Sequence, residues 1–181
     1  MDPGHTYAQT SSSIRHPLRG LLIAQFCGAF NDNAWKLMVA LLAIRQATAH
    51  MEPGPELETA AQTQTALTFI IFTLPLMLLS LVGGTFADRL SKRTVIIAIK
   101  IVEVFLMSAG TVALWLNPNG GILPLIVLCG MGVHSALFGP SKYGILPELI
   151  PHERLAAGNG LLEMWTFAAI LTGTAAGGLL L

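Results

Sequence analysis

Five long apolar runs restrict the folds open to this chain. A helix that crosses about 30 Å of hydrocarbon at 1.5 Å per residue needs roughly 20 residues, and each run is close to that length. The runs predict helices at about residues 18–44, 65–87, 94–116, 121–138 and 160–181. The chain is 53% hydrophobic and only 11% charged, whereas soluble proteins carry about 25% charged residues. We therefore expect an all-α polytopic membrane protein.

Cationic residues gather on one side of the predicted spans. Most Lys and Arg residues of the flanks and short loops share the side of the N-terminus, whereas Arg45 shares the other side with Glu52, Glu56 and Glu58. Because Lys and Arg collect in cytoplasmic loops, we place the N-terminus in the cytoplasm. Residues 1–17 then form a polar cytoplasmic tail.

Composition argues against several other classes of protein. The formal net charge is zero, so no nucleic-acid partner is predicted. Cys27 and Cys129 have no CxxC partner or nearby His ligands, so neither a metal nor a cofactor is predicted. His134 stands alone in the fourth helix, and we expect a hydrogen-bonded packing residue. The last run ends at Leu181 without a polar flank, which indicates the N-terminal part of a longer protein.

The first predicted helix carries a polar stretch, GAFNDNAWK, near its middle. It places Asn31, Asp32, Asn33 and Lys36 at the depth of the bilayer centre, where ionisable residues are costly and functional by default. Asp32 lies one turn before Lys36, the favourable order for an ion pair. We expect a substrate or ion pathway here. Asp32 would contact a cation or a headgroup amine, or carry a proton, and Lys36 would be its partner or a phosphate contact. The alternative is a structural ion pair that braces the bundle.

Polar residues and glycines also occur in the later helices. Lys100 and Glu103 form an i,i+3 pair in the third helix, for which we predict a structural role. Glu163 lies early in the fifth helix, and we assign it to the substrate or ion pathway. Gly173 and Gly177 form a GxxxG pattern, a common device for close helix packing.

The segment GGTFADRLSKRTV, residues 83–95, joins the second and third predicted helices. It resembles the signature loop of the major facilitator superfamily: Gly, three residues, Asp, Arg, one residue, usually Gly, then two basic residues. The matching residues are Gly84, Asp88, Arg89, Ser91, Lys92 and Arg93. We expect the glycine to permit a close helix approach, and the resemblance implies a charge network at a cytoplasmic gate. The alternative is an ordinary basic cytoplasmic loop.

The segment FGPSKYGILPELIPHERLAAGNGLLEM, residues 138–164, joins the fourth and fifth helices. Pro140, Pro147 and Pro151 argue against one continuous helix, and Pro151 suits the start of a new one. Lys142 and Arg154 would meet phosphate headgroups or pair with acidic neighbours, and both roles stay open. The candidate residues of this predicted cytoplasmic loop are Lys142, Tyr143, Glu148, Glu153, Arg154 and Asn159.

Together with QFCGAFNDNAWK, this segment resembles the bacterial lysophospholipid transporter family over all five spans. The resemblance implies five helices of a major facilitator N-terminal six-helix bundle. It also implies a secondary transporter that moves lysophospholipid across the bacterial inner membrane for reacylation. Membrane lipids would be partners, as would acyltransferase or acyl-carrier-protein synthetase modules fused to the chain or encoded nearby. In such transporters substrates and coupling ions bind near the midplane of the membrane, the depth expected for Asp32.

Two other functions stay open: the membrane anchor of a fused glycerophospholipid acyltransferase or synthetase, and a major facilitator transporter of another small solute. Such an acyltransferase needs a His, four residues, then an Asp that orients the imidazole. None of the five histidines is followed by that pattern, so these residues are not expected to be an enzyme.

The reading frame beyond Leu181 separates the transporter from the anchor. We expect about seven further spans for a transporter, given the two six-helix halves of this fold. A soluble domain directly after Leu181 would favour the anchor.

Overall fold

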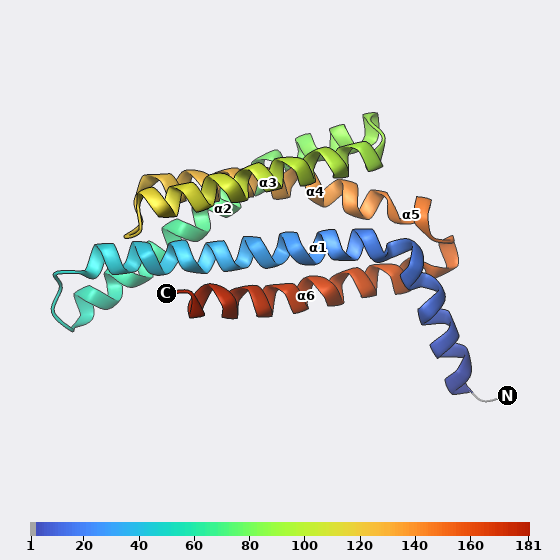
Figure 1. Ribbon diagram of the computed structural model, residues 1–181, viewed down its shortest axis with the longest axis horizontal. Helices are drawn as coiled ribbons and strands as arrows, with labels where there is room; N and C mark the ends of the chain where they lie inside the picture. Colours follow the sequence, from blue (N-terminus) through green and yellow to red (C-terminus); the bar gives the residue numbers. More distant parts are fainter. Residues whose placement is uncertain (1–2) are drawn as a thin grey trace.

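A computed structural model describes the backbone of residues 3–181 and the side chains of residues 18–85 and 90–181. Figure 1 shows the helices as an elongated bundle. The elements are α1 Pro3–Thr48, α2 Pro55–Arg89, α3 Lys92–Leu116, α4 Ile122–Gly144, α5 Leu146–Leu149, the 3-10 turn η1 His152–Arg154, and α6 Leu155–Leu179. The described backbone contains no strand, which confirms the predicted all-α fold.

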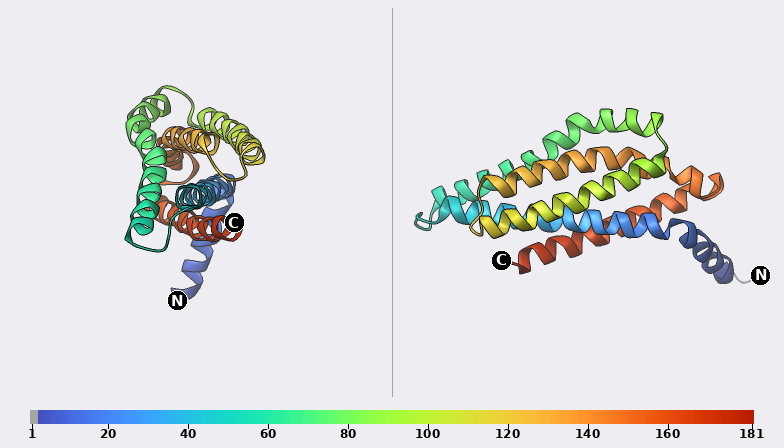
Figure 2. Two further views of the ribbon diagram at one scale, coloured as in Figure 1. Left: turned by 90° about the vertical axis from the view of Figure 1, so that its left-hand side faces the viewer. Right: turned by 45° about the horizontal axis from the view of Figure 1, so that its top comes forward.

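The long helices run side by side along the bundle. Viewed down the bundle in Figure 2, α4 lies between α2 and α3, and α1 lies next to α6. Among the described residues, three helices are long and apolar enough to cross a membrane: the Pro55–Thr85 part of α2, α3 and α4. α1 carries Asp32 and Lys36, and α6 is rich in glycine, alanine and threonine.

The first two helices begin much earlier than the sequence predicts, whereas α3 and α6 begin at Lys92 and Leu155, only a few residues before the predicted positions. α1 begins at Pro3, so most of the predicted tail continues the helix, and Figure 1 shows its first part turning away from the bundle. Proline is the usual cause of such a bend, and Pro17 lies within α1. α2 begins at Pro55, well before residue 65. Proline at the first position, with Glu56 and Glu58 in the first turn, is a favourable helix start.

The fourth helix is longer than predicted at its C-terminal end. α4 continues through Pro140 to Gly144, which corrects the predicted end near residue 138. Membrane helices tolerate proline where neighbouring helices and side chains satisfy the freed backbone groups. The correction places Lys142 and Tyr143 on the last turn of α4 instead of in a loop.

Glycines in α6 allow it to pack closely against α1. A Cβ at Gly173 would overlap the backbone oxygen of Phe30, and one at Gly177 would overlap that of Ala34. The GxxxG pattern is therefore a real contact surface in this fold, as the sequence predicts.

A second pair of glycines joins α2 to α4. A Cβ at Gly83 would overlap the backbone oxygen of Ala136, and one at Gly132 would overlap that of Phe72. The predicted close approach at Gly84 is wrong, because no atom of the described residues lies within 4 Å of a Cβ placed there. Gly83 faces α4 instead, one position earlier on α2.

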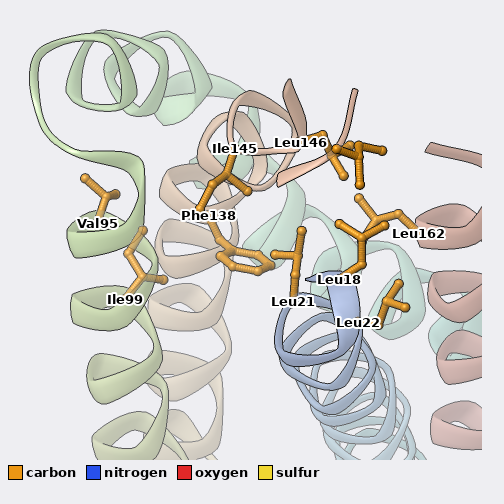
Figure 3. Packing of buried hydrophobic residues seen from close by; sticks show 10 residues of the cluster. Leu18, Leu21, Leu22, Val95, Ile99, Phe138, Ile145, Leu146 and Leu162 are labelled. Carbon is orange, nitrogen blue, oxygen red and sulfur yellow. The ribbon is translucent and has the colours of Figure 1, made fainter. Parts of the chain in front are cut away.

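Two buried apolar clusters lie at successive levels along the helices. Figure 3 shows the first, in which Phe138 of α4 lies near Leu21 of α1 and Ile99 of α3. The second consists of Trp35, Val39, Phe72, Ala113, Val127, Leu128 and Met131. Between the two levels, α1, α3 and α4 each carry polar side chains, so the bundle has a polar middle level.

Gly173→Ala is expected to lower the stability of the protein by about 1–3 kcal/mol, the usual cost of extra volume in a packed interior. The added Cβ would force α6 away from the backbone of Phe30. The thermal unfolding midpoint in detergent measures the loss. Gly160→Ala is the matched control on the same helix, because a Cβ there meets nothing within 4 Å. Equal midpoints for the two variants would contradict the close contact.

Candidate functional site

A pocket of about 310 Å³ lies in the polar middle level of the bundle. Helices α1, α2, α3, α4 and α6 all contribute to its walls. The apolar part of the lining includes Phe72, Leu76, Phe138 and Ile170. The charged and polar part includes Asp32, Asn33, Lys36, Lys100, His134, Ser135 and Lys142. The pocket therefore combines residues that the sequence assigned to the pathway, to the loop and to a structural pair.

Asp32 and Lys36 each take a partner from a neighbouring helix. The hydroxyl of Ser135 on α4 donates a hydrogen bond of 2.6 Å to Asp32 Oδ2. Lys36 Nζ lies 4.4 Å from the ring centroid of Phe72 on α2, a cation–π contact. The predicted direct ion pair between Asp32 and Lys36 is not formed among the described residues, although the two charges interact at longer range.

The two asparagines beside Asp32 lie on different faces of α1. Asn33 lines the pocket, and its amide donates a 2.7 Å hydrogen bond to the carbonyl of Ala29, one turn earlier. Asn31 instead lines a separate depression of about 490 Å³ between α1 and α3, beside Glu103. The structure thus brings Asn33 to the site and leaves Asn31 outside it.

Lys100 joins α3 to α1 and also reaches the pocket. Its ammonium donates hydrogen bonds of 2.6 Å to Glu103 Oε2 and 2.7 Å to the carbonyl of Ala24. It also lies 4.4 Å from the ring centroid of Phe138. The bond to α1 supports the predicted structural role of the pair, while the position of Lys100 in the pocket wall adds a charge to the site.

His134 contacts this pair from α4. Its Nε2 lies 3.4 Å from Glu103 Oε2, the same oxygen that binds Lys100, and forms no hydrogen bond within the described part of the chain. The sequence predicts that His134 is a hydrogen-bonded packing residue. The structure shows instead a buried imidazole beside a carboxylate, in the wall of the pocket.

The last turn of α4 meets α6 at one end of the pocket. The hydroxyl of Tyr143 donates a hydrogen bond to Glu163 Oε1. Lys142 Nζ lies 4.7 Å from the ring centroid of Tyr143 and interacts electrostatically with Glu163. Glu163 is thus next to the pocket, where it holds Tyr143 and partly balances the charge of Lys142.

A partly buried hydrogen bond between Gln25 and Thr166 was not anticipated from the sequence. Gln25 Nε2 donates to Thr166 Oγ1 over 2.8 Å and joins α1 to α6 in the wall of the pocket. The spacing in the sequence indicates the position of Gln25, because it precedes Asp32 by seven residues and both therefore lie on one face of a helix.

The predicted gate motif is joined to the segment after α4. Lys92 Nζ forms a 2.8 Å ion pair with Glu148 Oε1 on α5. Ser91, which replaces the usual glycine, caps α3 by accepting a 3.3 Å hydrogen bond from the amide of Thr94. The serine that differs from the motif therefore caps the N-terminus of α3.

The remaining candidates lie away from the pocket or outside the described side chains. The side chains of Asp88 and Arg89 are outside the described residues, so their role in the gate motif stays a prediction. Arg154 is half-buried in η1. The exposed candidates are Arg93, Glu153 and Asn159.

The arrangement is suited to an amphiphile that carries a phosphate. Three ammonium groups, those of Lys36, Lys100 and Lys142, line the pocket, where they provide donors for phosphate oxygens. Among the described lining residues, Asp32 provides the one carboxylate. This carboxylate is able to accept hydrogen bonds from an amine. The aromatic and aliphatic lining provides an apolar surface beside these charges.

Comparisons with known proteins show that the chain is similar to membrane transporters. A family model described as transmembrane secretion effector matches residues 57–181. The lysophospholipid transporter LplT of Photorhabdus laumondii is 37% identical over 94% of this chain and 39% of its own length. Its counterpart from Cronobacter sakazakii is 33% identical over 90% of the chain and 36% of its own length. The counterpart from Klebsiella pneumoniae is 35% identical over 88% of the chain and 35% of its own length. No solved structure matches the chain.

Ser135→Ala is expected to destabilise the bundle by about 1.5–3 kcal/mol, the range for a hydrogen bond to a charged group. The substitution removes the donor that Asp32 receives from α4. Ser108→Ala is the matched control, because the exposed hydroxyl of Ser108 bonds only the carbonyl of Val104 on its own helix. Thermal unfolding of both variants in detergent measures the difference, and a loss no greater than that of the control would contradict a stabilising bond.

Proposed function

We propose that this chain, which belongs to the transmembrane secretion effector family of the major facilitator superfamily, forms one helical bundle of a transporter for lysophospholipids. Its relatives from three bacteria carry the name lysophospholipid transporter. The chain spans less than two fifths of the length of these relatives. Transport is therefore proposed for a full-length protein that carries these residues.

The observation that carries the proposal is the mixed chemistry of the central pocket. A lysophospholipid has one acyl chain and a phosphate headgroup, so it needs cations and an apolar wall side by side. Lys36 and Lys142 would contact the phosphate, and Asp32 would contact a headgroup amine where the lipid has one. Phe72 and Leu76 provide apolar surface for the first part of the acyl chain.

The depth of the pocket supports an alternating-access mechanism. Asp32 lies roughly 21 Å along the predicted membrane part of α1, at 1.5 Å per residue, and hence near the midplane. Transporters of this type bind substrate at that depth, between two bundles that rock around the site. In this mechanism the second bundle would provide the opposite wall.

The basic end of the bundle supports a cytoplasmic gate. The chain is a multi-pass membrane protein, and we assign the N-terminus and the Lys92–Glu148 ion pair to the cytoplasmic face of the bacterial inner membrane. Lysophospholipid delivered there would become a substrate for reacylation. Acyltransferase or synthetase modules fused to the chain or encoded nearby are the partners that this reaction requires.

Asp32→Asn is expected to reduce lysophospholipid uptake at least tenfold, because the amide has the shape of the carboxylate but no charge for a headgroup amine. Uptake of radiolabelled lysophosphatidylethanolamine into proteoliposomes containing the full-length protein measures the effect. Glu58→Gln, an equal change of charge at an exposed position early in α2, is the control. Unchanged uptake by Asp32→Asn would remove the role given to Asp32, and no uptake by the unaltered protein would overturn the substrate assignment.

Substrate is expected to protect position 33, but not position 31, from thiol reagents. Asn33 lines the pocket, whereas Asn31 lies on another face of α1. Asn33→Cys and Asn31→Cys would be compared after both natural cysteines, Cys27 and Cys129, are replaced by serine. The rate of labelling by a maleimide is measured for each variant with and without lysophospholipid, and the ratio of the two rates gives the protection of that position. Equal protection of both positions would contradict binding in this pocket.

A further inference from the structure

We propose that His134 sets the preference of the pocket between anionic and zwitterionic headgroups, by taking up a proton that adds one positive charge to the pocket wall. The inference rests on the proposed function and concerns the same pocket. It assigns a specificity-determining role to a residue that the headgroup does not have to touch.

His134 is buried and interacts with two carboxylates from different helices. Its side chain is 4% exposed, and its Nε2 lies 3.4 Å from Oε2 of Glu103 on α3. The next residue, Ser135, donates a hydrogen bond to Asp32 on α1. Asp32 and His134 also interact electrostatically. A proton on the imidazole would therefore interact with the carboxylates of both Glu103 and Asp32.

Without that proton, the charges around the pocket are balanced. The charged groups that face this level are Asp32 and Lys36 on α1, Lys100 and Glu103 on α3, Lys142 on α4 and Glu163 on α6. The residues of α2 in the pocket wall, Phe72 and Leu76, do not titrate. Among the described residues, three carboxylates thus oppose three ammonium groups while the imidazole is neutral, and its protonation adds an excess of one positive charge.

Among the side-chain types in this set, imidazole has the ordinary pKa that lies nearest to neutral pH. The ordinary pKa of histidine is about 6.5, whereas ordinary carboxylates and amines titrate several units away. Glu103 Oε2 is shared by Lys100 at 2.6 Å and His134 at 3.4 Å. A protonated His134 therefore competes with Lys100 for this oxygen, which makes the ammonium of Lys100 more available to a ligand in the pocket.

The two charge states fit two kinds of headgroup. A zwitterionic headgroup brings one phosphate charge and one ammonium charge, which match a balanced pocket. An anionic headgroup brings the phosphate charge alone and matches the pocket with protonated His134. Because coupling between two bound species is reciprocal, an anionic lysophospholipid would also favour proton uptake.

The test compares uptake of lysophosphatidylglycerol and lysophosphatidylethanolamine by the full-length protein in proteoliposomes. Between about pH 8 and about pH 5.5, across the range in which imidazole titrates, the ratio of anionic to zwitterionic uptake is expected to rise about tenfold, the factor that corresponds to one pKa unit. In His134→Gln, which cannot take up a proton, the ratio of anionic to zwitterionic uptake should not change with pH. His152→Gln, at an exposed position in η1, should keep the rise. An unchanged rise in His134→Gln would overturn the proposal.

A second measurement needs no variant. Calorimetry of lipid binding to the purified unaltered protein, in buffers of different ionisation enthalpy, reports the number of protons taken up on binding. Proton uptake on binding of lysophosphatidylglycerol but not of lysophosphatidylethanolamine supports the proposal. Equal proton uptake with both lipids, or none with either, overturns it. If the unaltered protein binds these lipids but transports neither, the transport function fails while proton uptake still decides the role of His134. Absence of binding by both lipids overturns both proposals.

Discussion

The cost of holding charge within a bilayer governs how this bundle is built. An ionisable side chain near the membrane centre must find a partner or a wet cavity, since lipid provides neither. Described charged residues of the middle level have such partners on other helices. Ser135 of α4 donates to Asp32 of α1, and the carbonyl of Ala24 accepts from Lys100 of α3. The contacts that compensate charge therefore also fix the positions of the helices.

Close helix packing makes these polar contacts possible. A Cβ at Gly28 would lie only 2.7 Å from Nζ of Lys100, so a glycine at this position of α1 leaves room for the ammonium. Gly132 serves α4 in a comparable way, because it brings this helix against the backbone of α2 near Phe72. Phe72 in turn is the residue whose ring lies under the ammonium of Lys36. The small residues are thus part of the geometry of the pocket as well as of the helix contacts.

The sequence predicts the helices well and their contacts less well, for a physical reason. The length of an apolar run is a local property, so the all-α membrane fold follows from it. The i,i+4 spacing of Asp32 and Lys36 shows only that both lie on one face, whereas their partners Ser135 and Phe72 are set by the packing of other helices. The end of α4 was misplaced because the local cost of Pro140 is offset by tertiary contacts that sequence spacing does not reveal.

Hydrogen bonds between helices surround the pocket on several sides, and this bears on how the proposed transporter would move. Four links join helices around its walls: Asp32–Ser135 between α1 and α4, Gln25–Thr166 between α1 and α6, Tyr143–Glu163 between α4 and α6, and Lys100–Ala24 between α3 and α1. A motion that separated α1 from α3, α4 or α6 would leave partly buried polar groups unpaired, and a fully buried unpaired group costs about 1–3 kcal/mol. Rocking of the whole bundle against a second one breaks none of these bonds. The internal bonding of this bundle therefore favours a mechanism in which the pocket walls move as one body and access changes where the two bundles meet.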